Sequence, residues 1–351
     1  MNWQVIKFRF YWWCRKIILN GLYFLVVFLV ASFALLQFPS VQTALTSRMM
    51  RGFTAVSGFE ITYDKFYLVW YDRLEIEGLR ILDPAKNLMI AAERLQVNFE
   101  LSTLLSHHDI NLDAATLHGG QVNLVTLPET DTTKDLNINL FIAEINKQFA
   151  SSGTGGASPK INIGEIVLDQ SAFSYNNTDR DSIRQGFDYY HFRVGVPDGE
   201  VEDFKVIGDT IQLQVRTLVA TELKTKLDIK ELQTFFRYSK TGMEFLGMNL
   251  KAGQSVITDS VVFRYQSPAS FSDFNNKVNF SAKLKGTVIH PADLALFAPG
   301  AEALGQPLHL TGNLDGKVAR FTYHHMHIGI GTTQIAGQLD IDGLPSINET
   351  F

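Results

Sequence analysis

The sequence predicts a mainly β protein attached to one N-terminal transmembrane helix. Residues 17–36 form a run without charge, and a helix needs about 20 apolar residues to span a bilayer. From Glu60 to Ile341, apolar and polar residues alternate with period two in one short run after another, which is typical of strands that bury one face. Short turn signals join these runs, which favours a long antiparallel meander over alternating strand–helix units.

The composition excludes several classes of function. The chain has 351 residues and a net charge of -5, without the clustered basic residues of nucleic-acid-binding proteins. Its one cysteine, Cys14, precedes the apolar run, so the body has no disulfide or thiol nucleophile. The sequence contains no P-loop, nucleophile elbow or glycine-rich dinucleotide motif. We therefore expect no enzymatic activity, no catalytic residue, no cofactor, no metal and no nucleic-acid partner.

Charges around the apolar run predict its orientation. Residues 1–16 form a basic N-terminus, and the anchor runs from Ile17 to Leu36. Four Lys or Arg residues precede the anchor, whereas Arg48 and Arg51 follow it, so the positive-inside rule places the N-terminus in the cytoplasm and the body outside. A cleaved signal peptide is the rival interpretation, but the run is longer than the ~7–15 apolar residues of such signals.

An amphipathic helix is predicted over residues 37–57, directly after the anchor. Ser40 is its expected N-cap, and apolar residues recur at helical spacing from Val41 to Val56, with Arg48 and Arg51 on other faces. Two positions remain open for this helix. It either lies on the lipid surface or closes one end of the β body.

The β body is predicted in two parts. Residues 58–150 form a membrane-proximal β domain that ends in a helix over 137–150, whose apolar residues share one face. The sequence SSGTGGASP at 151–159 is typical of a flexible linker. The β-sheet continues over 160–351 and includes a short helix at 290–297.

The apolar face of such a sheet requires a cover. Three covers are open: a second sheet, closure into a barrel, or lipid acyl chains in an open gutter. The candidate residues of an apolar groove follow the alternation in three runs, and they are Ile211, Leu213, Val215, Phe263, Tyr265, Phe280 and Leu284. In the last run, the alternation is taken to continue through Gly286 to Val288.

The densest histidine cluster is interpreted as part of a wet strand face. On a regular strand, His325 and His327 share a face, which would permit a two-histidine metal site. The sequence brings no cysteine and no nearby carboxylate to complete such a site.

Several segments together resemble a known family. They are the basic N-terminus and single membrane helix, PSVQTALTSRMMRGF, GFEITYDKFYLVWYDRLEIEGLRILD, MIAAERLQVNFELSTLLS and INLDAATLHGGQVNL. The chain resembles the N-terminal region of TamB (translocation and assembly module B) proteins, AsmA-like proteins, in their Bacteroidetes-type form. The resemblance covers essentially the whole chain and is most specific over 37–125.

The resemblance implies an envelope protein. Such proteins are anchored in the bacterial inner membrane and extend through the periplasm, and their β body is similar to a curved, taco-shaped gutter with an apolar interior. They are linked to phospholipid transport between the two membranes and to outer-membrane protein assembly and secretion. The resemblance therefore implies phospholipid in the groove and an outer-membrane barrel partner, reached through a C-terminal region that this chain lacks.

A different class of function remains as an alternative. A membrane-tethered β-sandwich could bind a protein partner by adding a strand to an open sheet edge. The last predicted strand ends near Gly343 without a covering helix, and such an edge needs either a continuation of the chain or a partner.

Overall fold

The computed structural model describes residues 23–24, 27–28, 37–69, 72–100, 109–128, 134–151 and 160–343. Most of the predicted anchor and the predicted linker therefore lie outside the described residues. Within the anchor, Tyr23, Phe24, Val27 and Phe28 are helical and exposed. None of the helices in the described ranges combines the length and the apolarity that crossing a membrane requires.

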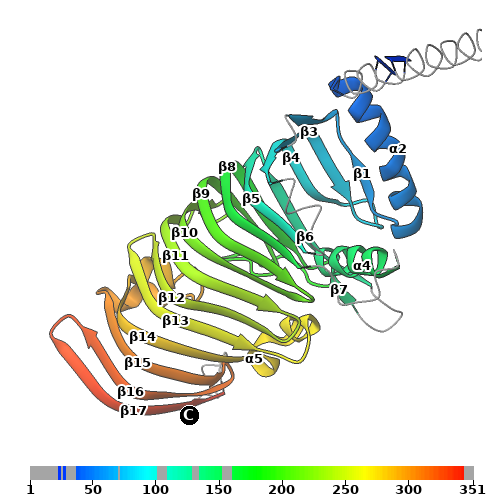
Figure 1. The fold of residues 1–351 in the computed structure, drawn as a ribbon. Coiled ribbons are helices and arrows are strands. Elements are labelled where there is room, and N and C mark those ends of the chain that lie inside the picture. The colour runs from blue at the N-terminus through cyan, green and yellow to red at the C-terminus, as the bar shows by residue number, and fades with distance from the viewer. Residues whose placement is uncertain are drawn as a thin grey trace, which may run out of the picture.

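The described strands form one large curved sheet, which is mostly antiparallel (Figure 1). The prediction of a mainly β body is confirmed, and the sheet has no second sheet packed on it among the described residues. The strands are β1 (Glu60–Thr62), β2 (Lys65–Val69), β3 (Arg73–Leu82), β4 (Leu88–Asn98), β5 (Ile110–His118), β6 (Gln121–Pro128), β7 (Lys134–Leu136), β8 (Ile161–Asn176), β9 (His191–Ile207), β10 (Thr210–Glu222), β11 (Asp228–Ser239), β12 (Gly242–Ala252), β13 (Ser255–Arg264), β14 (Asn279–Ile289), β15 (Leu308–Lys317), β16 (Arg320–Ile330) and β17 (Thr333–Asp342).

The described helices lie at the margins of this sheet. They are α2 (Pro39–Ser57), α4 (Asn137–Ser151), α5 (Phe274–Lys277), α6 (Pro291–Leu294) and the 3-10 helices η1 (Pro268–Asp273) and η2 (Ala301–Leu304). The predictions of a helix over 137–150 and of a short helix within 290–297 are confirmed. Ser40 is not the N-cap of α2, because Pro39 already occupies the first turn and Phe38 precedes it as N-cap, and the fixed φ of proline suits that first position.

One crossover interrupts the predicted meander. Strands β5 and β6 are two parts of one long strand, because Leu117 pairs with Leu168 and Val122 pairs with Phe173 in the same parallel register to β8. The chain leaves β6, passes through β7 and α4, and returns in the same direction as β8. This helical crossover makes the β5/β6–β8 pair parallel, so the prediction of a pure antiparallel meander was wrong here.

Bulges bend the strands of the C-terminal half. Gly247 in β12, Gly286 in β14 and His325 in β16 each add one residue relative to both neighbouring strands. All three have a positive φ, of 58°, 71° and 50°. A bulge bends its strand and increases its twist, and Figure 1 shows the resulting curvature of the sheet.

Helix α2 covers the free edge of the first strands. The Thr43 hydroxyl accepts a hydrogen bond from Phe66 N at 2.9 Å and donates to Phe66 O at 3.1 Å. The Gln42 side-chain oxygen accepts from Leu68 N at 2.5 Å. These side chains form hydrogen bonds with backbone groups of β2 that would otherwise be free to pair with another strand. Of the two predicted positions for this helix, closure of one end of the sheet is therefore observed.

Replacing Thr43 by Val is expected to reduce the unfolding free energy by about 1–3 kcal/mol, because two backbone groups of Phe66 lose their partner at nearly constant side-chain volume. Denaturant unfolding and amide exchange at Phe66 measure this. Ser40→Ala, on an exposed position of the same helix, should change stability by under about 0.5 kcal/mol. Equal effects of the two changes would contradict the edge-capping role.

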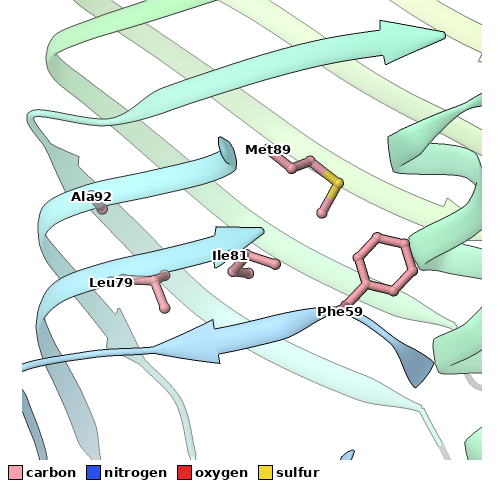
Figure 2. Packing of buried hydrophobic residues seen from close by; sticks show 5 residues of the cluster. All are labelled: Phe59, Leu79, Ile81, Met89 and Ala92. Carbon is pink, nitrogen blue, oxygen red and sulfur yellow. The ribbon is translucent and has the colours of Figure 1, made fainter. Parts of the chain in front are cut away.

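A compact core joins α2, α4 and the first strands. Phe59, Leu79, Ile81, Met89 and Ala92 form a buried cluster, and Figure 2 shows Met89 beside the ring of Phe59. Phe53 of α2 and Phe141 of α4 pack against this cluster. The Phe59 and Phe141 ring centroids are 5.0 Å apart, so the crossover helix packs over the first strands.

Buried amides fix the start of α4. Asn137 is fully buried and donates to Asp83 Oδ2 at 3.2 Å and to Asn123 O at 3.1 Å. Asn139 donates to the hydroxyl of Tyr238 at 3.0 Å. These bonds tie the crossover helix to both halves of the sheet and satisfy groups that would be costly to bury alone.

Candidate functional site

One face of the C-terminal half of the sheet is apolar from strand to strand. Directly opposed residues of antiparallel strands lie on the same face, so the register traces each row across the sheet. One row runs through Leu213, Phe236, Phe245, Val261, Ala282, Leu314, Tyr323 and Leu339. We name the side of the sheet that carries this row the apolar face.

The apolar face continues into the N-terminal half. Val215 of β10 pairs with Val201 of β9, which pairs with Ile166 of β8, and Ile166 pairs with Ala115 of β5. Ala115 belongs to a buried cluster with Val97 and Phe99, and Ile166 packs against this cluster. The apolar face therefore extends from the first strands, beneath α4, to β17.

A bulge also determines which residues of β14 lie on this face. In β14, Leu284 pairs with Gly312, and beyond Gly286 it is Thr287 and Ile289 that pair with Leu310 and Leu308. Val288 pairs with His309 on the opposite face. The alternation predicted from Gly286 to Val288 was therefore wrong, because the bulge at Gly286 shifts the phase by one residue.

Helical segments cover part of the apolar face along one rim. Phe271 of η1 lies with its ring centroid 4.7 Å from that of Tyr265, and Phe274 of α5 lies 5.7 Å from Phe263. This cover sits where β13 ends and β14 begins. Beyond it, Ile328 and Ile330 of β16 remain partly accessible, and Ile335 of β17 is 49% exposed.

Tyrosine hydroxyls on the apolar face stay neutral. Burial raises the pKa of Tyr238, Tyr265 and Tyr323. Tyr265 donates to Ser239 O at 2.9 Å, and Tyr323 donates to Thr311 O at 3.1 Å. Because the hydroxyls of Tyr265 and Tyr323 bond to the protein backbone, their rings add apolar surface without adding charge.

The opposite face carries ion pairs. Glu244 of β12 lies between Arg237 of β11 and Arg264 of β13, with Arg237 Nη2 at 2.6 Å from Glu244 Oε2. Burial raises the pKa of Glu244, but hydrogen bonds from Arg237 and Arg264 lower it further, so its pKa lies below the ordinary 4.5. The sheet thus separates a charged face from an apolar face across one layer.

The Glu244 ion pairs predict a pH-dependent contribution to stability. A carboxylate whose pKa is lowered by folding stabilises the protein above its unfolded pKa of 4.5, and this contribution disappears as the pH falls through the lowered value. Glu244→Gln is expected to cost about 1–2 kcal/mol at neutral pH, since both arginines are half exposed.

Urea unfolding across acid pH measures this difference. The wild type and Glu244→Gln should converge in acid, where Glu244 is protonated in both the folded and the unfolded state. Glu231→Gln is the matched control, because its partner Lys251 is an exposed cation at 2.6 Å, and such pairs contribute under about 1 kcal/mol. A difference for Glu244→Gln that stays constant into acid would contradict the assigned role.

A bulge interrupts the predicted alternation within the histidine cluster of β16. His325 is the bulge residue of β16, while His324 pairs with Asn313 and His327 pairs with Thr311 on the charged face. The bulge interrupts the regular two-residue period on which the predicted common face of His325 and His327 rested, and both side chains are exposed. In the part of the chain that the structure describes, no group of three or more His, Cys, Asp or Glu side chains is placed to hold a metal ion.

The predicted groove residues all fall on the apolar face. Ile211, Leu213 and Val215 lie on β10, Phe263 on β13, Tyr265 directly after it, and Phe280 and Leu284 on β14. The sequence reasoning missed the residues beyond each bulge that also share this face, such as Met248, Leu250, Ile257 and Ile289. Glycine within a strand was the available signal for these phase shifts.

No protein-family model and no curated protein sequence matches the chain.

Proposed function

We propose that this protein is an inner-membrane-anchored, periplasmic AsmA/TamB-like protein whose apolar sheet face binds phospholipid acyl chains. The observation that carries the proposal is the apolar face itself, which continues across a single-layer sheet. The bulges in β12 and β16 restore the apolar phase that a regular strand would lose. Ordinary packing needs a second layer on such a face, whereas a lipid-binding surface needs an accessible one.

Acyl chains suit this face chemically. Each CH₂ that moves from water into apolar surroundings gains about 0.8 kcal/mol. A phospholipid could keep its headgroup at the rim while its chains lie along the rows of Phe, Leu and Ile. No reacting group is required, which agrees with a non-enzymatic role in phospholipid transport between membranes, in outer-membrane protein assembly and secretion, or in both.

Lipid mass spectrometry of the purified full-length chain tests this proposal. After extraction in mild detergent and exchange into a lipid-free amphipathic polymer, we expect phospholipid to be retained by the wild type. Retention should fall in Ile328→Glu, which places a carboxylate on the accessible part of the apolar face. A folded chain that emerges free of lipid would argue against acyl-chain binding.

Capture of a partner strand is a second candidate, favoured by β17. Among the described strands, β17 pairs with β16 alone, and its residues from Thr333 to Asp340 are exposed. An edge strand of this kind offers backbone groups to an added strand. A lipid-free but folded chain that binds an extended peptide at β17 would favour this function.

A further inference from the structure

Helix α2 has a second apolar surface, on the side that faces away from the sheet. Gln42 and Thr43 point to β2, whereas Val41, Leu45 and Val56 are 37%, 55% and 66% exposed. The N-cap Phe38 is 57% exposed. With about 3.6 residues per turn, these four apolar positions fall within an arc of about 60°.

Two basic residues border this apolar arc on one side. Arg48 and Arg51 are both exposed, and α2 contains no acidic residue. On the helical projection, Arg48 lies directly beside Val41. An exposed apolar stripe bordered by arginines is the pattern of a helix that lies in the interface of an anionic membrane.

We propose that the outward side of α2, made of Phe38, Val41, Leu45, Val56, Arg48 and Arg51, docks on anionic phospholipid headgroups. This inference rests on the proposed membrane anchoring, because α2 begins only three positions after Leu36, the end of the charge-free run. The positive charge of the helix complements an anionic leaflet, and each nearby basic residue strengthens binding about fivefold.

Docking would give the sheet a defined position on the bilayer. The inward side of α2 is hydrogen-bonded to β2, which lies at the N-terminal end of the sheet. Figure 1 shows α2 along that end of the sheet. If α2 contacts the membrane with one side and β2 with the other, the start of the apolar face lies at the lipid surface. Acyl chains can then move from the bilayer onto this face.

A depth measurement with a single label tests the docking. The full-length chain with Cys14→Ser has no cysteine, so Leu45→Cys carries one environment-sensitive fluorophore. The protein is reconstituted in phosphatidylcholine vesicles with or without phosphatidylglycerol, and the vesicles contain lipids with a quencher on the acyl chain. Gln338→Cys on exposed β17 is the matched control.

We expect the acyl-chain quencher to quench the label at Leu45 and to leave the label at Gln338 unaffected. Adding Arg48→Gln and Arg51→Gln should lower the docked-to-free ratio about 25-fold in phosphatidylglycerol vesicles. Quenching that is unchanged by these substitutions would overturn recognition of anionic headgroups.

The outcomes separate this inference from the proposed function. Flotation of the vesicles in a density gradient shows whether the chain is anchored. If the chain floats with the vesicles but its Leu45 label stays in water, docking by α2 is overturned and anchoring is left intact. A chain that does not float overturns both anchoring and docking. Lipid retention by the apolar face is measured independently of either result.

Discussion

Deletion of Asn249 is expected to cost about 2–5 kcal/mol of unfolding free energy, because it reverses the faces of the following β12 residues. Leu250 and Ala252 would leave the apolar face, and Lys251 would enter it. The bulge at Gly247 can absorb the deletion only by turning the buried Met248 to the charged face. Both rearrangements remove apolar side chains from their packed positions.

Deletion of Gly247, two residues earlier, is the matched control. Gly247 is the extra residue of β12 relative to both β11 and β13, so its removal keeps Phe245, Met248 and Leu250 on the apolar face. We expect this deletion to straighten the strand at a cost under about 2 kcal/mol. Chemical denaturation of the two deletion variants measures the difference. Equal losses would show that the bulge does not set the phase of the apolar face.

Replacing Leu213 by Glu is expected to weaken phospholipid binding about 100-fold, since a charge among acyl chains costs about 3 kcal/mol. Leu213 lies between Ile211 and Val215 on the apolar face of β10 and is only partly buried. Titration with a fluorescent phospholipid measures the change, and circular dichroism shows whether the sheet is retained.

Gln212→Glu is the control for this substitution, because Gln212 is the preceding residue and pairs with Arg237 on the charged face. It introduces the same charge one residue away, so we expect lipid affinity within about twofold of the wild type. A comparable loss in both variants would indicate a general effect of charge, and an unchanged affinity in Leu213→Glu would place the lipid elsewhere.

The strand content and one-sided apolarity of this protein could be predicted from sequence because they are local properties. In β10, the pairing with β11 is regular from Ile211 to Val215, and the predicted faces hold there. The helix over 137–150 was predicted for the same reason, since its apolar residues recur at helical spacing and Asn137 begins it at the predicted position.

The errors arose where long-range pairing decides the structure. Whether Gly286 continues an alternation or inserts an extra residue depends on its neighbours β13 and β15, which the β14 sequence does not encode alone. The parallel pairing of β5 with β8 depends on the path of the crossover through α4. The hydrogen bonds from Thr43 to β2 likewise join residues far apart in the chain.

The accessibility of the apolar face could be determined only from the structure. Period-two alternation fits a sandwich, a barrel and an open sheet equally well. The single sheet formed by the described strands removes the two-sheet cover, and the packing of α4 and η1 shows which parts of the face are occupied by protein. The role of the remaining apolar residues in lipid binding is the central proposal.

Photo-crosslinking on both faces of the sheet tests that proposal most directly. A photoreactive residue is placed in the full-length chain at Leu213 or Ile328 on the apolar face, and at Gln212 or His327 as the neighbour on the charged face. After irradiation in membranes, mass spectrometry identifies the adducts. We predict phospholipid adducts at Leu213 and Ile328 alone. Equal labelling of both faces, or no lipid adduct on the apolar face of the folded protein, would contradict the proposed lipid-binding surface.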